Sequence, residues 1–402
     1  KYDVEHINPH LCTHLIYTFV GLDYNGNIVS LDPYLDLPDN YGRNNFRKFN
    51  ALKHQNPSLK TLVAVGGWNE GSAKFSTMAA NPAQRQNFIN SALNMITTYG
   101  FDGLDVDWEY PNRRDTVHGV ADIDNFSTLL RETKEAFDRR GLLLTAAVSA
   151  TEAAAIQSYD VRTISRYLDL VNLMTYDMNG AWDPFTGHNA PLFRGEGGVA
   201  DERNTVEQSL RFWINAGCPP EKITLGIPFY GRTFTLQNPA QNGVGAPSSG
   251  DGISGQYTGT NGFIGYNEFC LKLRTEPWDR RYDSSARVPY AVQDRNWVSY
   301  DDPDSIIAKV EYAKQFNIRG IMLWSIETDD FHGICGAIDR SGSTMTSGNF
   351  TGISSTTNSA STLLILHKLY SGFAYTRNNF VYCLKDASGR FIFIEFKCTA
   401  KL

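Results

Sequence analysis

The sequence predicts an α/β protein in which parallel strands form a barrel inside a ring of helices. Seven short apolar runs recur along the first 336 of its 402 residues, and longer amphipathic segments lie between them. This alternation is typical of parallel strands joined by helical crossovers. The runs are almost continuously apolar, which indicates strands that are covered on both faces.

The predicted strands are, in chain order, 13–20, 59–65, 103–108, 142–149, 170–176, 224–229 and 318–325. The amphipathic segments predict helices at 82–99, 123–140, 205–216 and 305–316. A (β/α)8 TIM barrel needs eight strands to close around its interior, so one strand is unaccounted for. Residues 1–7 have a helical pattern, and we therefore expect the absent first strand to precede residue 1.

The composition divides the chain into a segment long enough to form a barrel and a shorter tail. Residues 1–336 contain the barrel pattern, and residues 235–303, rich in Gly, Ser, Tyr and Pro, predict an α+β subdomain inserted before the last strand. Residues 337–362 have the Ser/Thr-rich composition of a linker. Residues 363–402 form a small aromatic and cysteine-bearing unit, which is too short to hold a core unaided.

Charge and cysteine usage exclude several classes of protein. There are 37 basic and 43 acidic residues with no basic stripe, so nucleic acid is not an expected partner. No apolar run approaches the roughly 18 residues of a membrane span, and the cysteine spacing fits no zinc site. Two glycosylation motifs, at Asn125 and Asn349, favour a secreted protein.

Two cysteines are placed to join the insertion to the barrel. Cys270 lies inside the predicted insertion and Cys335 follows the last strand, so a disulfide between them is expected. Two unpaired buried thiols are the alternative. Cys218 lies where no bridge is expected and is interpreted as a free thiol.

The third predicted strand carries an unusual row of acids. Along this strand Asp105, Asp107 and Glu109 alternate with Leu104, Val106 and Trp108. Since strand side chains switch faces at every residue, the acids share one face and the apolar side chains share the other. If the apolar face packs against helices, the carboxylates point into the barrel, where at least one should hold a proton. Glu109 lies nearest the carboxyl end, where barrels place their chemistry.

Three tryptophans accompany the acids at the same end of the barrel. Trp68, Trp182 and Trp324 lie at or beyond the ends of separate predicted strands. One such tryptophan would more often belong to the core, but three together suggest flat walls that stack on sugar rings. A solvated acidic edge strand and a divalent metal site are alternatives for the acids, although neither explains the tryptophans.

Five motifs, each at the end of a separate strand, carry a resemblance to a known family. They are Asp102-x-x-Asp105-x-Asp107-x-Glu109, Ala64-Val-Gly66-Gly67-Trp68, Met174-Thr-Tyr176-Asp177, Tyr230-Gly-Arg232 and Met322-Leu-Trp324. In this order they resemble a glycoside hydrolase family 18 chitinase of the animal type, over residues 1 to 336. The tail resembles a peritrophin-type chitin-binding module of which only Cys383 and Cys398 remain among the cysteines.

The resemblance implies retaining hydrolysis of β-1,4-linked N-acetylglucosamine polymers in which the substrate supplies the nucleophile. Glu109 would protonate the glycosidic oxygen while the acetamido carbonyl of the sugar attacks the anomeric carbon. Asp107 would hold the acetamido N–H, Asp105 would share its proton, and Tyr176 would bind the attacking carbonyl.

The resemblance also implies which residues bind the polymer. These substrate-binding residues are Gly67, Trp68, Tyr110, Met174, Asp177, Trp182, Tyr230, Arg232 and Trp324. No metal or cofactor is implied, and the expected partner is chitin or its oligosaccharides. A secreted, endo-acting monomer is the resulting hypothesis.

Two other functions remain open from the sequence. One is an inactive chitinase-like lectin or growth factor that binds chitooligosaccharides, although such relatives typically lose the acid that Glu109 supplies here. The other is a metal-dependent hydrolase that uses the acidic strand for its ligands.

Overall fold

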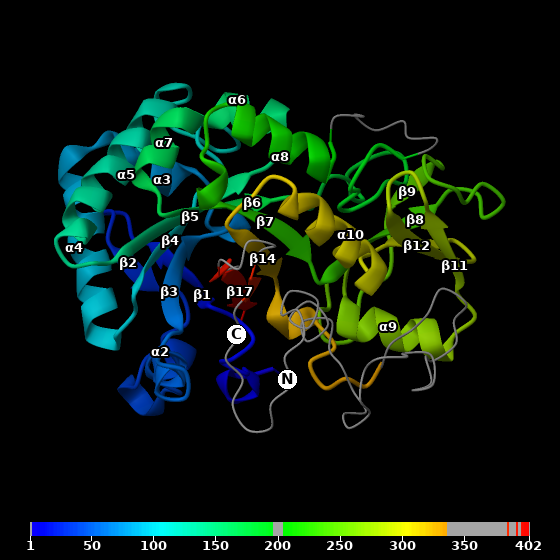
Figure 1. Ribbon diagram of the computed structural model, residues 1–402, viewed down its shortest axis with the longest axis horizontal. Helices are drawn as coiled ribbons and strands as arrows, with labels where there is room; N and C mark the ends of the chain where they lie inside the picture. Colours follow the sequence, from blue (N-terminus) through cyan, green and yellow to red (C-terminus); the bar gives the residue numbers. More distant parts are fainter. Residues whose placement is uncertain (1, 196–203, 336–383, 386–390, 393–394, 402) are drawn as a thin grey trace.

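The fold is described from a computed structural model (Figure 1). It describes residues 2–195 and 204–335, together with the strand positions 384–385, 391–392 and 395–401. Parallel strands occupy the centre of the larger lobe in Figure 1 and helices surround them, while a second sheet projects to one side. The predicted linker and most of the predicted tail module lie outside the described residues.

All seven predicted barrel strands are present, and their ends agree with the prediction to within two residues. They are β1 (His14–Leu22), β3 (Lys60–Gly66), β4 (Gly103–Asp107), β5 (Leu143–Ser149), β6 (Leu170–Met174), β7 (Ile223–Pro228) and β14 (Gly320–Trp324). Neighbours in this series pair in parallel from β1 to β14, as expected for crossover connections.

The eighth position of the barrel is occupied by β17 (Glu395–Lys401), a strand near the other end of the chain. It pairs in parallel with β14, where Gly320 is opposite Glu395, and with β1, where His14 is opposite Lys397. The barrel therefore closes, and the edges that seven strands would expose find backbone partners. These residues belong to segment 363–402, for which the sequence predicted a separate chitin-binding-like module.

Ten α-helices and several short strands accompany the barrel in the described residues. The helices are α1 (Pro33–Asp36), α2 (Asn45–Ala51), α3 (Ala73–Ala80), α4 (Pro82–Tyr99), α5 (Ala121–Asp138), α6 (Glu152–Ser158), α7 (Val161–Tyr167), α8 (Val206–Asn215), α9 (Tyr266–Thr275) and α10 (Pro303–Lys314). The short strands outside the insertion are β2 (Ile28–Ser30), β15 (Leu384–Lys385) and β16 (Phe391–Ile392).

Helix α4 shows how the sequence fixes the ends of these crossovers. The Asn81 side chain accepts hydrogen bonds from the first-turn N–H groups, Pro82 occupies the first helical position, and Gly100 ends the helix with φ 85°. Side-chain caps of this kind satisfy N–H groups that have no partner within the helix, and proline and glycine suit these two positions.

The insertion is an α+β subdomain, as predicted, and it begins at Tyr230 rather than at residue 235. Its strands are β8 (Tyr230–Leu236), β9 (Ser248–Asp251), β10 (Phe263–Gly265), β11 (Asp279–Asp283), β12 (Val288–Gln293) and β13 (Asn296–Ser299), and α9 packs beside them. Cys270 on α9 and Cys335 after β14 form a disulfide with a Cα–Cα distance of 5.9 Å, which joins the insertion to the barrel.

The remaining cysteines of the described residues differ in state. Cys218 is buried and free, as the sequence suggested, and burial raises the pKa of its thiol to about 11. Cys12 is disulfide-bonded. Among the described residues no helix combines the length and the apolar character that a membrane span requires.

Candidate active site

The acidic strand β4 and the turn after it deliver three carboxylates to one cleft. Leu104, Val106 and Trp108 are at most 1% exposed and belong to the main hydrophobic core. Asp105, Asp107 and Glu109 alternate with them and line a cleft of about 2050 Å³ at the barrel mouth. The alternation in the sequence therefore produces the expected separation of faces, and an exposed acidic edge strand is excluded.

Asp105 is the deepest of the three acids, and the barrel interior satisfies one of its oxygens. Its Oδ1 accepts a hydrogen bond from Asn172 Nδ2 at 2.8 Å and another from the Thr145 hydroxyl. Asn172 is held in turn by the Thr224 hydroxyl, which donates to its Oδ1 at 2.7 Å. Donors fixed in this way favour a charged carboxylate.

Asp107, unlike Asp105, is buried without a hydrogen-bond donor to its Oδ1 in the part of the chain that the structure describes. It is 5% exposed, and its Oδ1 has no hydrogen-bond partner among the described residues. Burial, followed by the charges of Glu109 and Asp105, raises the pKa of Asp107 well above its ordinary value. The protonated form of Asp107 is therefore favoured beside a hydrogen-bonded Asp105.

Glu109 is also held ready to carry a proton near neutral pH. Burial raises the pKa of Glu109 from 4.5 to about 7, and the nearby charge of Asp177 acts in the same direction. A hydrogen bond from Tyr110 and the positive charge of Arg114 oppose this rise. A carboxyl with such a pKa suits general acid catalysis near neutral pH.

Two glycines allow the turn after β3 to approach the acidic strand. Gly66 has φ 117°, and a Cβ atom there would lie 2.1 Å from the Asp107 carbonyl oxygen. Gly67 has φ 82°, donates its N–H to the same carbonyl at 2.9 Å, and would place a Cβ atom 2.7 Å from the Phe19 ring. Gly66 lines the cleft but Gly67 does not, so the sequence-predicted contact of Gly67 with substrate has no support in the geometry.

One wall of the cleft is built around Asp177. Its Oδ1 accepts hydrogen bonds from the Tyr230 hydroxyl at 2.8 Å and from Arg232 Nε at 2.7 Å. The Arg232 guanidinium lies 5.0 Å from the centre of the Trp182 ring, and Trp182 is 60% exposed. Two separate motifs of the sequence and Trp182 thus meet in one cluster that can bind hydroxyl and amide groups.

The floor of the cleft is aromatic and sulfur-bearing. The Tyr176 hydroxyl lies 3.7 Å from the Met322 sulfur, and Met174 lines the same space. Trp324 lies at the end of β14 with its ring centre 5.6 Å from that of Phe19. Every sequence-predicted site residue except Gly67 lines this one cleft.

Several cleft residues escaped the sequence analysis. Phe19 lies within the apolar run of β1, Phe263 stacks on Tyr230 with ring centres 4.5 Å apart, and Tyr257 is an exposed aromatic of the insertion. Arg114 does not line the cleft itself but contacts Trp68, which does. An aromatic within an apolar strand looks like core, and the insertion offers no motif, so no signal in a single sequence marks them.

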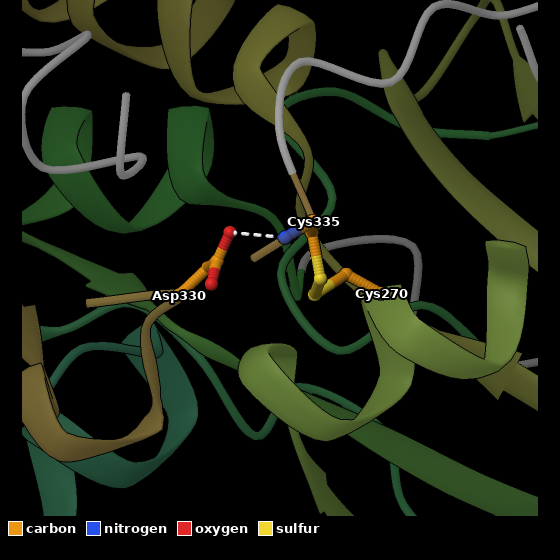
Figure 2. A group of neighbouring side chains, drawn as sticks. All are labelled: Cys270, Asp330 and Cys335. Carbon is orange, nitrogen blue, oxygen red and sulfur yellow. Dashed lines mark hydrogen bonds between the residues drawn. A yellow bond between two sulfur atoms is a disulfide. The ribbon is translucent and has the colours of Figure 1, made fainter. Parts of the chain in front are cut away.

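A cluster of potential metal ligands that does not include the acids of β4 is present in the described residues, and Figure 2 shows it. It consists of Cys270, Asp330 and Cys335. The two sulfur atoms are bonded to each other, and the Asp330 carboxylate accepts hydrogen bonds from the backbone N–H groups of Ile334 and Cys335 at 2.8 Å. A disulfide offers no thiolate, so this group closes the loop after β14 rather than holding an ion.

A parallel barrel in which the acids of β4 line an aromatic cleft is an arrangement that glycoside hydrolases use. The family model described as glycosyl hydrolases family 18 matches residues 1–329. The chain belongs to this family.

Relatives and solved structures agree with this assignment. The chain is 44% identical to "Probable chitinase 2" of Drosophila melanogaster over 345 residues, which are 83% of this chain and 69% of that protein. It is 58% identical to the Ostrinia furnacalis Group IV chitinase solved with allosamidin, with a TM-score of 0.82 over 84% of this chain and 90% of that one. Human YKL-39, a pseudo-chitinase with retained chitooligosaccharide binding, is 37% identical, with a TM-score of 0.76 over 83% of this chain and 89% of that one.

Proposed function

We propose that this chain is an endo-acting chitinase that hydrolyses β-1,4-linked N-acetylglucosamine polymers with retention at the anomeric carbon. The observation that carries the proposal is Glu109, a buried carboxyl with a pKa of about 7 in a cleft walled by aromatic rings. Chitinases occur both among the sequence relatives and among the similar solved structures, and they support the substrate class.

The first chemical step assigns each acid a separate role. Glu109 donates its proton to the glycosidic oxygen, and the acetamido carbonyl oxygen of the substrate bonds to the anomeric carbon as the leaving group departs. Family 18 enzymes are known for such substrate assistance. Asp107 accepts a hydrogen bond from the acetamido N–H through its unpartnered Oδ1 and stabilises the cyclic cation. Water then opens this intermediate while Glu109 takes back a proton.

Asp105 supports this step by sharing charge with Asp107. Asn172 and Thr145 supply the hydrogen bonds that stabilise Asp105 as an anion. When Asp107 turns toward the substrate, its proton is shared with Asp105, so the pair carries one negative charge throughout. The Tyr176 hydroxyl, on the cleft floor, binds the attacking carbonyl.

The placement of the tryptophans supports cleavage within a chain. Trp68 follows β3, on one side of β4, and Trp182 follows β6, on the other side in the sheet order. Sugar rings can therefore stack on both sides of Glu109, as an endo-acting enzyme requires. Asp177, Tyr230 and Arg232 bind hydroxyl and acetamido groups next to Trp182.

The setting and the assembly are part of the same proposal. The disulfide between Cys270 and Cys335 supports secretion into an oxidising environment. We propose that the protein acts as a monomer with chitin or chitooligosaccharides as its partner. The chitin-binding unit stays a prediction only for the part of the tail before β17, because β17, which carries Cys398, pairs with β1 and β14 in the barrel.

A sugar-binding protein without catalysis is the second candidate, because the YKL-39 structure has a related fold and retained oligosaccharide binding. The presence of Glu109 with its raised pKa favours catalysis.

The test is the substitution Glu109→Gln, assayed with chitin oligosaccharides for product and for binding. We expect turnover to fall at least a hundredfold, as loss of a general acid predicts, while oligosaccharide binding is retained. Glu135→Gln is the matched control because Glu135 lies on the outer face of α5, where it pairs with Arg131. Unchanged turnover in Glu109→Gln would refute the assignment, and binding without turnover in the unaltered protein would establish the second candidate.

A further inference from the structure

Arg114 joins the tryptophan wall of the cleft to the segment that carries the catalytic acid. Its guanidinium carbon lies 3.7 Å from the centre of the Trp68 ring, which is stacking distance. One of its nitrogen atoms, Nη1, donates hydrogen bonds to the Trp68 carbonyl oxygen at 2.8 Å and to the Glu109 carbonyl oxygen at 3.0 Å. A single side chain therefore holds the ring and the backbone of two neighbouring loops.

The backbone around Arg114 reinforces this connection. Arg114 has φ 64°, in the left-handed region that non-glycine residues rarely adopt. The next residue, Asp115, accepts the Ser72 N–H at 2.8 Å at the start of α3, and the Ser72 hydroxyl donates to the Tyr110 carbonyl oxygen at 2.9 Å. The loops after β3 and β4 are thus joined at several points, and only Arg114 among these contacts the indole ring.

Trp68 needs such support because it is 58% exposed and follows two glycines. An exposed ring on a glycine-rich turn would sample several rotamers, and ordering it during binding would cost conformational entropy. The guanidinium covers one face of the ring, which leaves the other face for a sugar.

We propose that Arg114 is a positioning residue that fixes Trp68 as a sugar platform and thereby sets the preference for long over short oligosaccharides. The inference rests on the proposed chitinase function. Arg114 does not touch the reacting atoms, and its effect reaches the substrate through Trp68. The contribution belongs to binding of those sugar units that reach Trp68, on the β3 side of the cleaved bond.

The test compares Arg114→Met and Arg114→Lys in the full chain, with KM and kcat measured separately for tri- and hexasaccharides of N-acetylglucosamine. For Arg114→Met we expect KM for the hexasaccharide to rise roughly fivefold and kcat to stay within about twofold, as loss of an exposed cation–π contact predicts. Arg114→Lys keeps the positive charge but loses the planar guanidinium that stacks on the ring, so its KM for the hexasaccharide should lie between those of the unaltered protein and Arg114→Met.

A Trp68→Ala background separates positioning from a general structural role. If Arg114 acts through Trp68, Arg114→Met should have no further effect on the hexasaccharide KM when Trp68 is already Ala. The control Arg47→Met removes another arginine stacked on an aromatic, Tyr99, at 5.4 Å and outside the cleft, and should leave both constants unchanged.

An equal rise of KM in the Trp68→Ala background would overturn the proposal, as would a fall in kcat that is the same for both substrates. Should Arg114→Met fail to fold, an unchanged KM in Arg114→Lys would overturn it, and an increase that vanishes in the Trp68→Ala background would support it. Failure of the proposed function is a different result, because the unaltered protein would then cleave neither oligosaccharide.

Discussion

The alkaline limb of the pH profile is the most direct consequence of the electrostatics around Glu109. Glu109 must be protonated to donate, and its pKa is raised from 4.5 to about 7. At pH 6 such a group is roughly 90% protonated, whereas a carboxyl with a pKa of 4.5 would be roughly 3% protonated. Activity should therefore persist to neutral pH and fall about tenfold per pH unit above pH 7.

Two substitutions should move this limb in opposite directions. Tyr110→Phe removes a hydrogen bond that stabilises the charged carboxylate, so the pKa of Glu109 rises further and the limb moves to higher pH. Asp177→Asn removes a negative charge that disfavours ionisation, so the pKa falls and the limb moves to lower pH. Burial, the largest cause of the raised pKa, is unaltered in both variants.

The assay is kcat/KM for a soluble chitin oligosaccharide between pH 4 and 10, because this ratio reports ionisations of the free enzyme. Because Glu109 and Asp107 interact, the limb reports an apparent pKa of the coupled groups. A limb near pH 5 in the unaltered protein, or shifts of the same sign in both variants, would refute this account of the acid.

Two further predictions concern stability and are measured as free energies of unfolding in urea. Replacing Cys270 and Cys335 together by Ala should lower the free energy of unfolding by up to about 4 kcal/mol, because the disulfide closes a loop spanning 65 residues. An unchanged free energy would show that the insertion packs on the barrel equally well without the disulfide. Lys309→Met should lower the free energy of unfolding by about 3 to 5 kcal/mol, because it leaves the Asp301 carboxyl buried without its cation. The control Lys314→Met removes an ion pair at the surface and should change the free energy little. Equal losses in the two variants would contradict this reasoning.

The barrel strands and the acidic row could be predicted because short-range patterns determine them. Leu104, Val106 and Trp108 alternate with the acids, and this period of two fixes which side chains face the helices whatever lies elsewhere in the chain. Asn81 and Gly100 marked the ends of α4 in the same local way. The strands and crossover helices were therefore found nearly at their observed bounds.

The closure of the barrel could not be predicted because it depends on residues far apart in sequence. Strand β17 pairs with β1 across almost the whole chain length, and a seven-residue segment of mixed polarity carries no signal for that partner. Arg114 was missed for a related reason, since an arginine in a polar loop has the appearance of a surface charge until the loop is folded onto Trp68.

The same strand that supplies the acids also explains why Asp105 and Asp107 differ in their hydrogen-bond partners. Asp105 points into the interior, where Thr145 on β5 and Asn172 on β6 supply side-chain donors. Asp107, two residues further along, lies above this layer and meets none of them among the described residues. A spacing of two residues, about 6.6 Å along a strand, thus separates a layer that offers hydrogen-bond donors from one in which burial raises the pKa of Asp107. The division of roles among the acids follows from their depth in the barrel, because the deeper Asp105 accepts hydrogen bonds from both Asn172 and Thr145.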